Sequence, residues 1–163
     1  MLTPAQIAAK FEAIDAHDDT VEGFSFHPPT KRSGKASVTL TLFRHWENKR
    51  RLVTFTGCTN IETIVDSDVL KDNAPNNTCS FEARADVAEI EGVMRRQKKS
   101  WNVSYEKSID PLPRKLTNTS NLVLFRVRLF GGSLVIVAKS FAIKRLTLPS
   151  SGTVTKLSKG MIQ

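Results

Sequence analysis

The sequence predicts an α+β fold in which a twisted antiparallel sheet of hairpins is packed on one side by two helices. Two β-rich segments flank the dipeptide 131–132, which is Gly-Gly, and this pattern is typical of a tight hairpin. Residues 37–43 and 52–56 alternate apolar and polar side chains, whereas the regions near 4–15 and 83–99 have helical periodicity. Because hairpins follow one another instead of alternating with helices, we expect an antiparallel sheet.

Composition and length favour one soluble domain over residues 1–149, followed by a C-terminal tail over 150–163. The chain has 163 residues, of which 40% are hydrophobic and 25% charged, as in ordinary globular proteins. The beginning of the sequence lacks the pattern of a signal peptide, and no apolar stretch approaches the ~20 residues of a membrane-spanning helix. Cys58 and Cys79 stand in no metal-binding or redox spacing. These features predict a cytoplasmic protein without membrane attachment.

The first half of the chain begins with a helix and continues into strands. Thr3, Pro4 and Gln6 form the capping-box pattern with proline at the first helical position. Residues 21–26 are interpreted as a short strand, which two prolines end, and the five residues 46–50 are expected to form a hairpin loop between the strands at 37–43 and 52–56. Residues 61–65 are too few to assign, and the Asp/Asn-rich stretch 66–78 is expected to be a surface loop.

The second half is expected to begin with a helix from residue 82 to 99. Its apolar residues Val87, Ile90 and Met94 are three and four positions apart, and its acidic residues precede its basic ones, which complements the helix dipole. Residues 103–106 are interpreted as a short strand and 110–120 as a connecting loop that contains two prolines.

The hairpin of residues 122–143 is the strongest local signal. With residues 131 and 132 as its loop, Phe130 would pair with Ser133 and Arg128 with Val135. One face is then entirely apolar, and the other carries basic and aromatic side chains, namely Arg126, Arg128, Lys139, Phe130 and Phe141. Whether a second copy of the chain pairs with an exposed edge of this hairpin, giving a homodimer, stays open.

Charge is distributed unevenly along the chain. Residues 1–91 hold 10 Lys/Arg and 14 Asp/Glu, whereas residues 92–163 hold 14 and 2, so the second half carries all of the net +8. Such an excess indicates an acidic partner. The candidate contact residues are those of the hairpin face and of the basic helix end: Arg126, Arg128, Lys139, Arg95, Arg96, Lys98, Lys99, Trp101, Phe130 and Phe141.

Two kinds of partner fit this basic surface. An acidic protein would be held by charge-assisted hydrogen bonds from the arginines, and this is the favoured hypothesis. A nucleic acid would be held by phosphate contacts and by stacking on the aromatic rings, although the chain contains no known nucleic-acid-binding motif. The structural alternative is that Arg126 and Arg128 lie over a helix and pair with its acids, such as Glu89 or Glu91.

Catalysis is the third hypothesis, and it depends on His17, Asp18 and Asp19. An imidazole beside carboxylates can exchange protons or bind a metal, but no second cluster at suitable spacing completes a site. A polar turn that ends the first helix is the better interpretation. The chain lacks a nucleotide-binding loop and hydrolase motifs, so we expect no cofactor, no metal and no catalytic residue.

The order of these elements resembles several small bacterial families of unknown or immunity-type function. The shared features are His17 and Asp18 after a short helix, then strands at 21–26 and 38–43. The resemblance implies a non-catalytic protein that binds another protein, and it assigns no functional residue.

Overall fold

The computed structural model describes residues 1–31, 34–65, 78–105 and 119–146, without the side chains of 65, 78–79 and 97–105. Its helices and strands are, in chain order, α1 (Pro4–Glu12), β1 (Thr20–His27), β2 (Ser37–Arg44), β3 (Lys49–Thr56), β4 (Asn60–Val65), β5 (Thr78–Arg84), α2 (Val87–Tyr105), β6 (Val123–Leu129), β7 (Gly132–Ala138) and β8 (Ser140–Leu146). The predicted tail at 150–163 and most of the predicted loops at 66–78 and 110–120 lie outside these residues.

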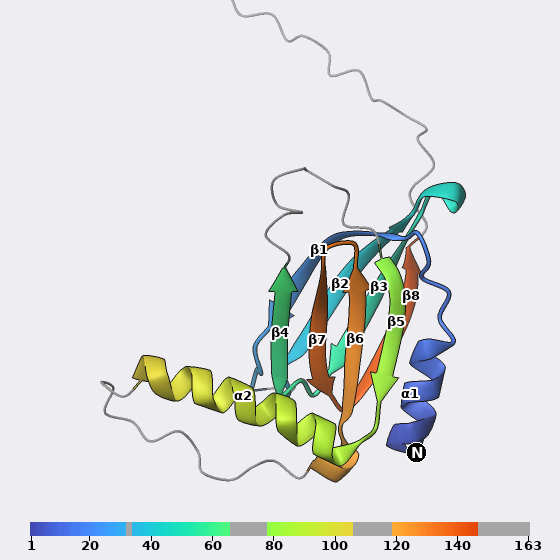
Figure 1. Ribbon diagram of the computed structural model, residues 1–163. Coiled ribbons are helices and arrows are strands. Elements are labelled where there is room, and N and C mark those ends of the chain that lie inside the picture. Colours follow the sequence, from blue (N-terminus) through green and yellow to red (C-terminus); the bar gives the residue numbers. More distant parts are fainter. Residues whose placement is uncertain (32–33, 66–77, 106–118, 147–163) are drawn as a thin grey trace, which may run out of the picture.

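The strands form two antiparallel sheets instead of the single sheet that the sequence predicts. Sheet A has the order β1-β2-β3-β8 and sheet B the order β4-β7-β6-β5. The two sheets lie face to face, with sheet B in front in Figure 1. The α+β class and the antiparallel pairing are confirmed, and the hairpins are divided between two layers.

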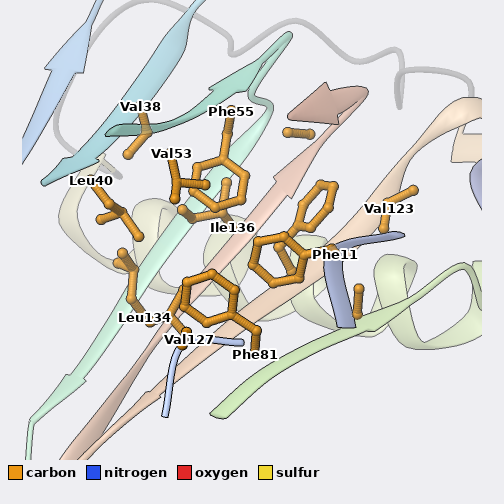
Figure 2. Close-up of a cluster of buried hydrophobic side chains, with 14 of the residues drawn as sticks. Phe11, Val38, Leu40, Val53, Phe55, Phe81, Val123, Val127, Leu134 and Ile136 are labelled. Atoms are coloured by element: carbon orange, nitrogen blue, oxygen red, sulfur yellow. The ribbon is translucent and has the colours of Figure 1, made fainter. Parts of the chain in front are cut away.

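Side chains from both sheets fill the space between the layers. β2 and β3 each alternate between buried and half-buried residues, as their sequence pattern predicts. Figure 2 shows Phe11 of α1 among the core side chains of both sheets. The Phe11 ring stacks on Phe81 at 4.6 Å and meets Phe55, Phe125 and Phe141 edge-on at 4.9 to 5.7 Å. These aromatic contacts fix α1 to both sheets.

The two helices lie on different sides of the molecule, so their predicted placement on one side of a sheet is wrong. α1 lies beside β5 and β8 at one open side of the two layers (Figure 1). α2 lies across the outer face of sheet B, where Ile90 and Val93 pack against Leu124, Val135 and Val137. Sheet B therefore buries apolar side chains on both faces, which requires a cover on each.

Two strands occupy segments that the sequence analysis assigned otherwise. β4 covers the unassigned residues 60–65, and β5 covers 78–84, so Glu82 belongs to a strand and α2 begins only at Val87. The Asp86 carboxylate accepts the N–H of Glu89 at 2.9 Å and so caps the start of this helix. The predicted strand at 103–106 is also wrong, because residues 103–105 are the last residues of α2.

The hairpin forms in a register shifted by two residues. Arg128 pairs with Ser133 and Arg126 with Val135, so Phe130 and Gly131 are the turn residues. Gly131 supplies the positive φ of 85° that this turn needs at its second position. Since a shift of two residues preserves the side-chain alternation, Arg126 and Arg128 stay on the predicted face.

The predicted second strand of this hairpin is divided at Lys139. β7 ends at Ala138 in sheet B, and β8 begins at Ser140 in sheet A. The N–H of Lys139 donates to the carbonyl of Thr56 at 3.1 Å, which brings the chain alongside β3. Phe141 and Arg126 therefore belong to different sheets, and the prediction that they share one face is wrong. Among the described helices, none is long and apolar enough to cross a membrane.

Candidate functional site

The predicted arginines of the hairpin lie on the outer face of sheet B, where acidic residues neutralise them. Arg128 Nε is 2.7 Å from Glu82 Oε1. The Arg126 guanidinium is 3.7 Å from both Glu82 and Glu89. The sequence analysis gave pairing of these arginines with Glu89 of the helix as the structural alternative to partner binding, and the structure shows this pairing for Arg126.

The predicted basic residues of α2 are neutralised in the same way where their side chains are described. Arg95 contacts Glu91 one helical turn earlier at 2.8 Å, and Arg96 contacts Glu62 of β4 at 3.5 Å. Lys98, Lys99 and Trp101 also belong to α2, but their side chains lie outside the described residues. The four described arginines of the predicted site thus all have acidic partners.

The predicted basic face consequently carries much less net charge than its sequence suggests. Glu62 and Glu82 belong to β4 and β5, the two strands that the sequence analysis did not identify. Glu82 lies directly opposite Arg126 in the register of β5 and β6. Folding therefore brings acids of the first half of the chain onto bases of the second half.

A groove of about 900 Å³ lies between α1 and β8, away from this arginine face. Its lining is mainly apolar and comprises Met1, Leu2, Pro4, Ile7, Lys10, Ile14, Lys35, Asn121, Lys139, Ser140, Phe141, Ala142 and Ile143. The capping box at Thr3 fixes the start of α1, and Phe11 anchors the helix in the core. The groove is thus bounded by two elements that the fold holds in place.

Among the described residues, the charged side chains that line the groove are all lysines, and none is acidic. Lys10, Lys35 and Lys139 are exposed. Lys10 and Lys139 form no ion pair with any described residue. The Lys139 stem passes over Gly57, where an added Cβ would meet its Cγ at 3.0 Å, and Gly57 has a φ of 70°. This groove therefore combines apolar surface with two lysines, Lys10 and Lys139, that form no ion pair within the described part of the chain.

One side of the groove is the free edge of a sheet. β8 pairs with β3 on one side only and, in the described part of the chain, has no strand on the other. Four consecutive residues, 140–143, line the groove. Because successive strand residues point to opposite faces, a surface that touches all four must run along the strand edge. Within the described residues, the outer edge of β8 thus presents backbone groups without a strand partner.

Two residues of the predicted site, Lys139 and Phe141, contribute to this groove. Phe141 is half-buried, and its ring lies 5.1 Å from Phe11 and 5.8 Å from Phe125. Phe130, at the tip of the other hairpin, is 60% exposed and lies in a different region. Lys10 and Ile143 were missed by sequence reasoning, because the contact between the first helix and the last strand gives no local signal.

The His17-Asp18-Asp19 segment forms the predicted polar turn after α1. His17 Nδ1 lies 2.7 Å from Asp18 Oδ2 at the surface, and Asp18 has a left-handed φ of 61°. Asp19 is fully buried and is bound by Arg44 Nε at 3.0 Å and by Arg51. Two guanidinium groups thus engage the Asp19 carboxylate and connect the turn to β2 and β3.

Burial shifts the pKa of two further groups in this part of the molecule, the Arg51 guanidinium and the Cys58 thiol. Desolvation lowers the pKa of Arg51, whose Nε has no hydrogen-bond partner. Burial also raises the pKa of the Cys58 thiol to about 11, and its Sγ donates to the Phe55 carbonyl at 3.4 Å. Burial therefore disfavours the thiolate form of Cys58 at neutral pH. The described residues contain no group of three or more side chains placed to hold a metal ion.

No protein-family model, curated protein or solved structure matches the chain in comparisons with known proteins.

Proposed function

We propose that this protein is a non-catalytic binding protein whose partner is an acidic protein, bound in the groove between α1 and β8. The observation that carries the proposal is the contrast between the groove lysines and the paired arginines. Lys10 and Lys139 have no acidic partner within the described chain, so an external carboxylate gains their full attraction. The proposal keeps the predicted partner class but assigns the contact to this groove instead of the arginine face.

The apolar part of the groove favours a protein over a nucleic acid. Ile7, Ile14, Phe141 and Ile143 line it and offer surface for aliphatic or aromatic side chains of a partner. A nucleic acid would instead use the arginine face, but Glu82 and Glu89 already occupy those guanidinium groups. Phosphate contacts there would have to displace existing ion pairs.

Binding of a synthetic peptide that alternates glutamate and valine, measured by calorimetry across a salt series, tests this assignment. The variant Lys10→Gln/Lys139→Gln removes two charges from the groove, and Arg126→Gln/Arg128→Gln removes two from the outer face of sheet B. We expect the lysine variant to lose about tenfold in affinity and the arginine variant less than about twofold. Equal losses, or a larger loss in the arginine variant, would contradict the groove assignment.

Single-stranded DNA of the same length is the second probe. We expect it to bind more weakly than the peptide at every salt concentration. Tighter binding of DNA, with affinity that falls steeply as salt rises and that depends on Arg126 and Arg128, would replace the acidic protein with a nucleic acid. Unchanged folding of both variants is checked by circular dichroism and by the midpoint of thermal unfolding.

A further inference from the structure

We propose that the acidic partner binds as an extended segment that adds a strand to the free edge of β8. This inference rests on the proposed function and specifies how the groove is used. The main-chain groups along residues 140–143 would pair with the segment, while alternate side chains of the segment enter the groove. Phe141 and Ile143, which share one face of β8, would form the apolar floor beneath those side chains.

The other edge strands are less suited to strand addition. A bulge between Val21 and Gly23 disturbs β1, and such irregularities are a common protection of sheet edges. At the β5 edge, the Glu12 carboxylate of α1 accepts the backbone N–H of Ala83 at 3.1 Å. β4 pairs regularly, but the cavity beside Ile64 is lined by Arg126 and Arg128, whose guanidinium groups already contact Glu82.

β8, by contrast, pairs without interruption along its length. Its seven residues are in continuous register with β3, from Ser140 opposite Thr56 to Leu146 opposite Arg50. The backbone of this strand is therefore regular enough to direct the hydrogen bonds of an added strand. The regular edge and the apolar groove lie side by side, which lets one extended ligand use both.

The charge of β8 selects an acidic strand over a second copy of β8. Lys144 and Arg145 follow the groove residues, are exposed, and form no ion pair with a described residue. Pairing of two β8 edges would bring these cations and Lys139 close to their equivalents, and lysines on an edge strand disfavour such self-association. The same cations attract a strand that carries carboxylates. Repulsion between two copies of β8 and attraction for carboxylates therefore both favour an acidic strand as the partner.

Backbone N-methylation of the glutamate/valine peptide provides the decisive experiment, because it removes amide donors and leaves every side chain and charge in place. We expect the unmodified peptide to slow hydrogen exchange of outward-facing amides in β8. We also expect alternate N-methylation to weaken binding at least about tenfold. A lysine/valine peptide serves as the control for charge and should not bind measurably.

The outcomes separate the binding mode from the proposed function. Equal binding of the methylated and unmodified peptides, with a continued dependence on Lys10 and Lys139, would overturn strand addition and leave the acidic-partner proposal standing. If neither the unmodified nor the methylated acidic peptide bound, both the strand addition and the acidic-partner proposal would be overturned. Tight binding of oleate without peptide binding, or dimerisation through β8 detected by sedimentation, would likewise overturn strand addition.

Discussion

The outer face of sheet B and the groove beside β8 both contain basic residues from the second half of the chain, yet their electrostatic states differ. On sheet B, Arg126 and Arg128 share Glu82 at 2.7 to 3.7 Å. In the groove, Lys10 and Lys139 have no acid within reach among the described residues. A count of charges along the sequence therefore does not locate a binding surface, because pairing across the fold decides where charge remains uncompensated.

This difference in ion pairing affects the electrostatic potential at the two surfaces more than the stability of the fold. Exposed ion pairs such as those of Arg128 contribute only about 0 to 1 kcal/mol to folding. They nevertheless cancel much of the potential that a ligand would experience at that face. Lysines without an ion pair gain no such contribution and keep their attraction for a partner. Substitutions in the two regions are therefore expected to change ligand binding more than unfolding.

The largest effect is expected from removal of the residue that holds the groove in place. Phe11 is fully buried, and its ring contacts aromatic residues of both sheets. Phe11→Ala should lower the free energy of unfolding by about 3 to 5 kcal/mol, because it leaves a cavity in the core. The groove should lose its peptide affinity as α1 loosens, which urea unfolding and calorimetry can measure.

Phe24 provides the matched control for this substitution. It is 57% exposed on β1, so Phe24→Ala removes the same side chain without creating a buried cavity. We expect a change below about 0.5 kcal/mol and unchanged peptide binding. Similar destabilisation by the two alanine variants would show that Phe11 does not anchor the helix as the structure indicates.

A smaller loss of unfolding free energy is expected from Asp19→Asn. This substitution tests a third case, a charged side chain that is both ion-paired and fully buried. Asp19 is the shared acid of Arg44 and Arg51; Arg51 contacts it through a terminal guanidinium nitrogen, and its Nε has no hydrogen-bond partner. Without the carboxylate, the buried Arg51 guanidinium loses its ion pair, whereas Arg44 keeps its contacts with Asp15 and Glu47, and we expect a loss of about 3 kcal/mol in urea unfolding. The neighbouring Asp18→Asn is the control, because asparagine tolerates the left-handed backbone of that exposed residue.

Local patterns of the sequence were sufficient for the fold class and for several elements. The capping box at Thr3, the alternation of 37–43 and the glycine turn all act over a few residues, and the corresponding elements are present. The register of the hairpin was wrong by two residues, because a turn with positive φ at only one position uses Phe130-Gly131. β4 was missed because six residues give too short a period to assign.

The candidate site depended on tertiary contacts that no local pattern contains. Lys139 and Phe141 were predicted to bind a partner, but their predicted neighbours were Arg126 and Arg128 on one continuous hairpin face. The transfer of the chain from sheet B to sheet A at Lys139 separates these pairs. The groove exists because the first helix meets the last described strand, a contact between residues far apart in the sequence.

The smallest effect on stability, and the sharpest test of the comparison, is expected from Glu82→Gln. This change removes the acid that Arg126 and Arg128 share, so the outer face of sheet B should acquire the uncompensated charge that distinguishes the groove. We expect a loss of about 1 kcal/mol or less in unfolding, together with stronger binding of single-stranded DNA at low salt. Glu22→Gln changes the net charge equally on sheet A, where Glu22 pairs with Arg50 at 2.7 Å. If both variants gained the same DNA affinity, overall charge would govern binding and local pairing would not, whereas a gain confined to Glu82→Gln would show that the ion pairs mask this face.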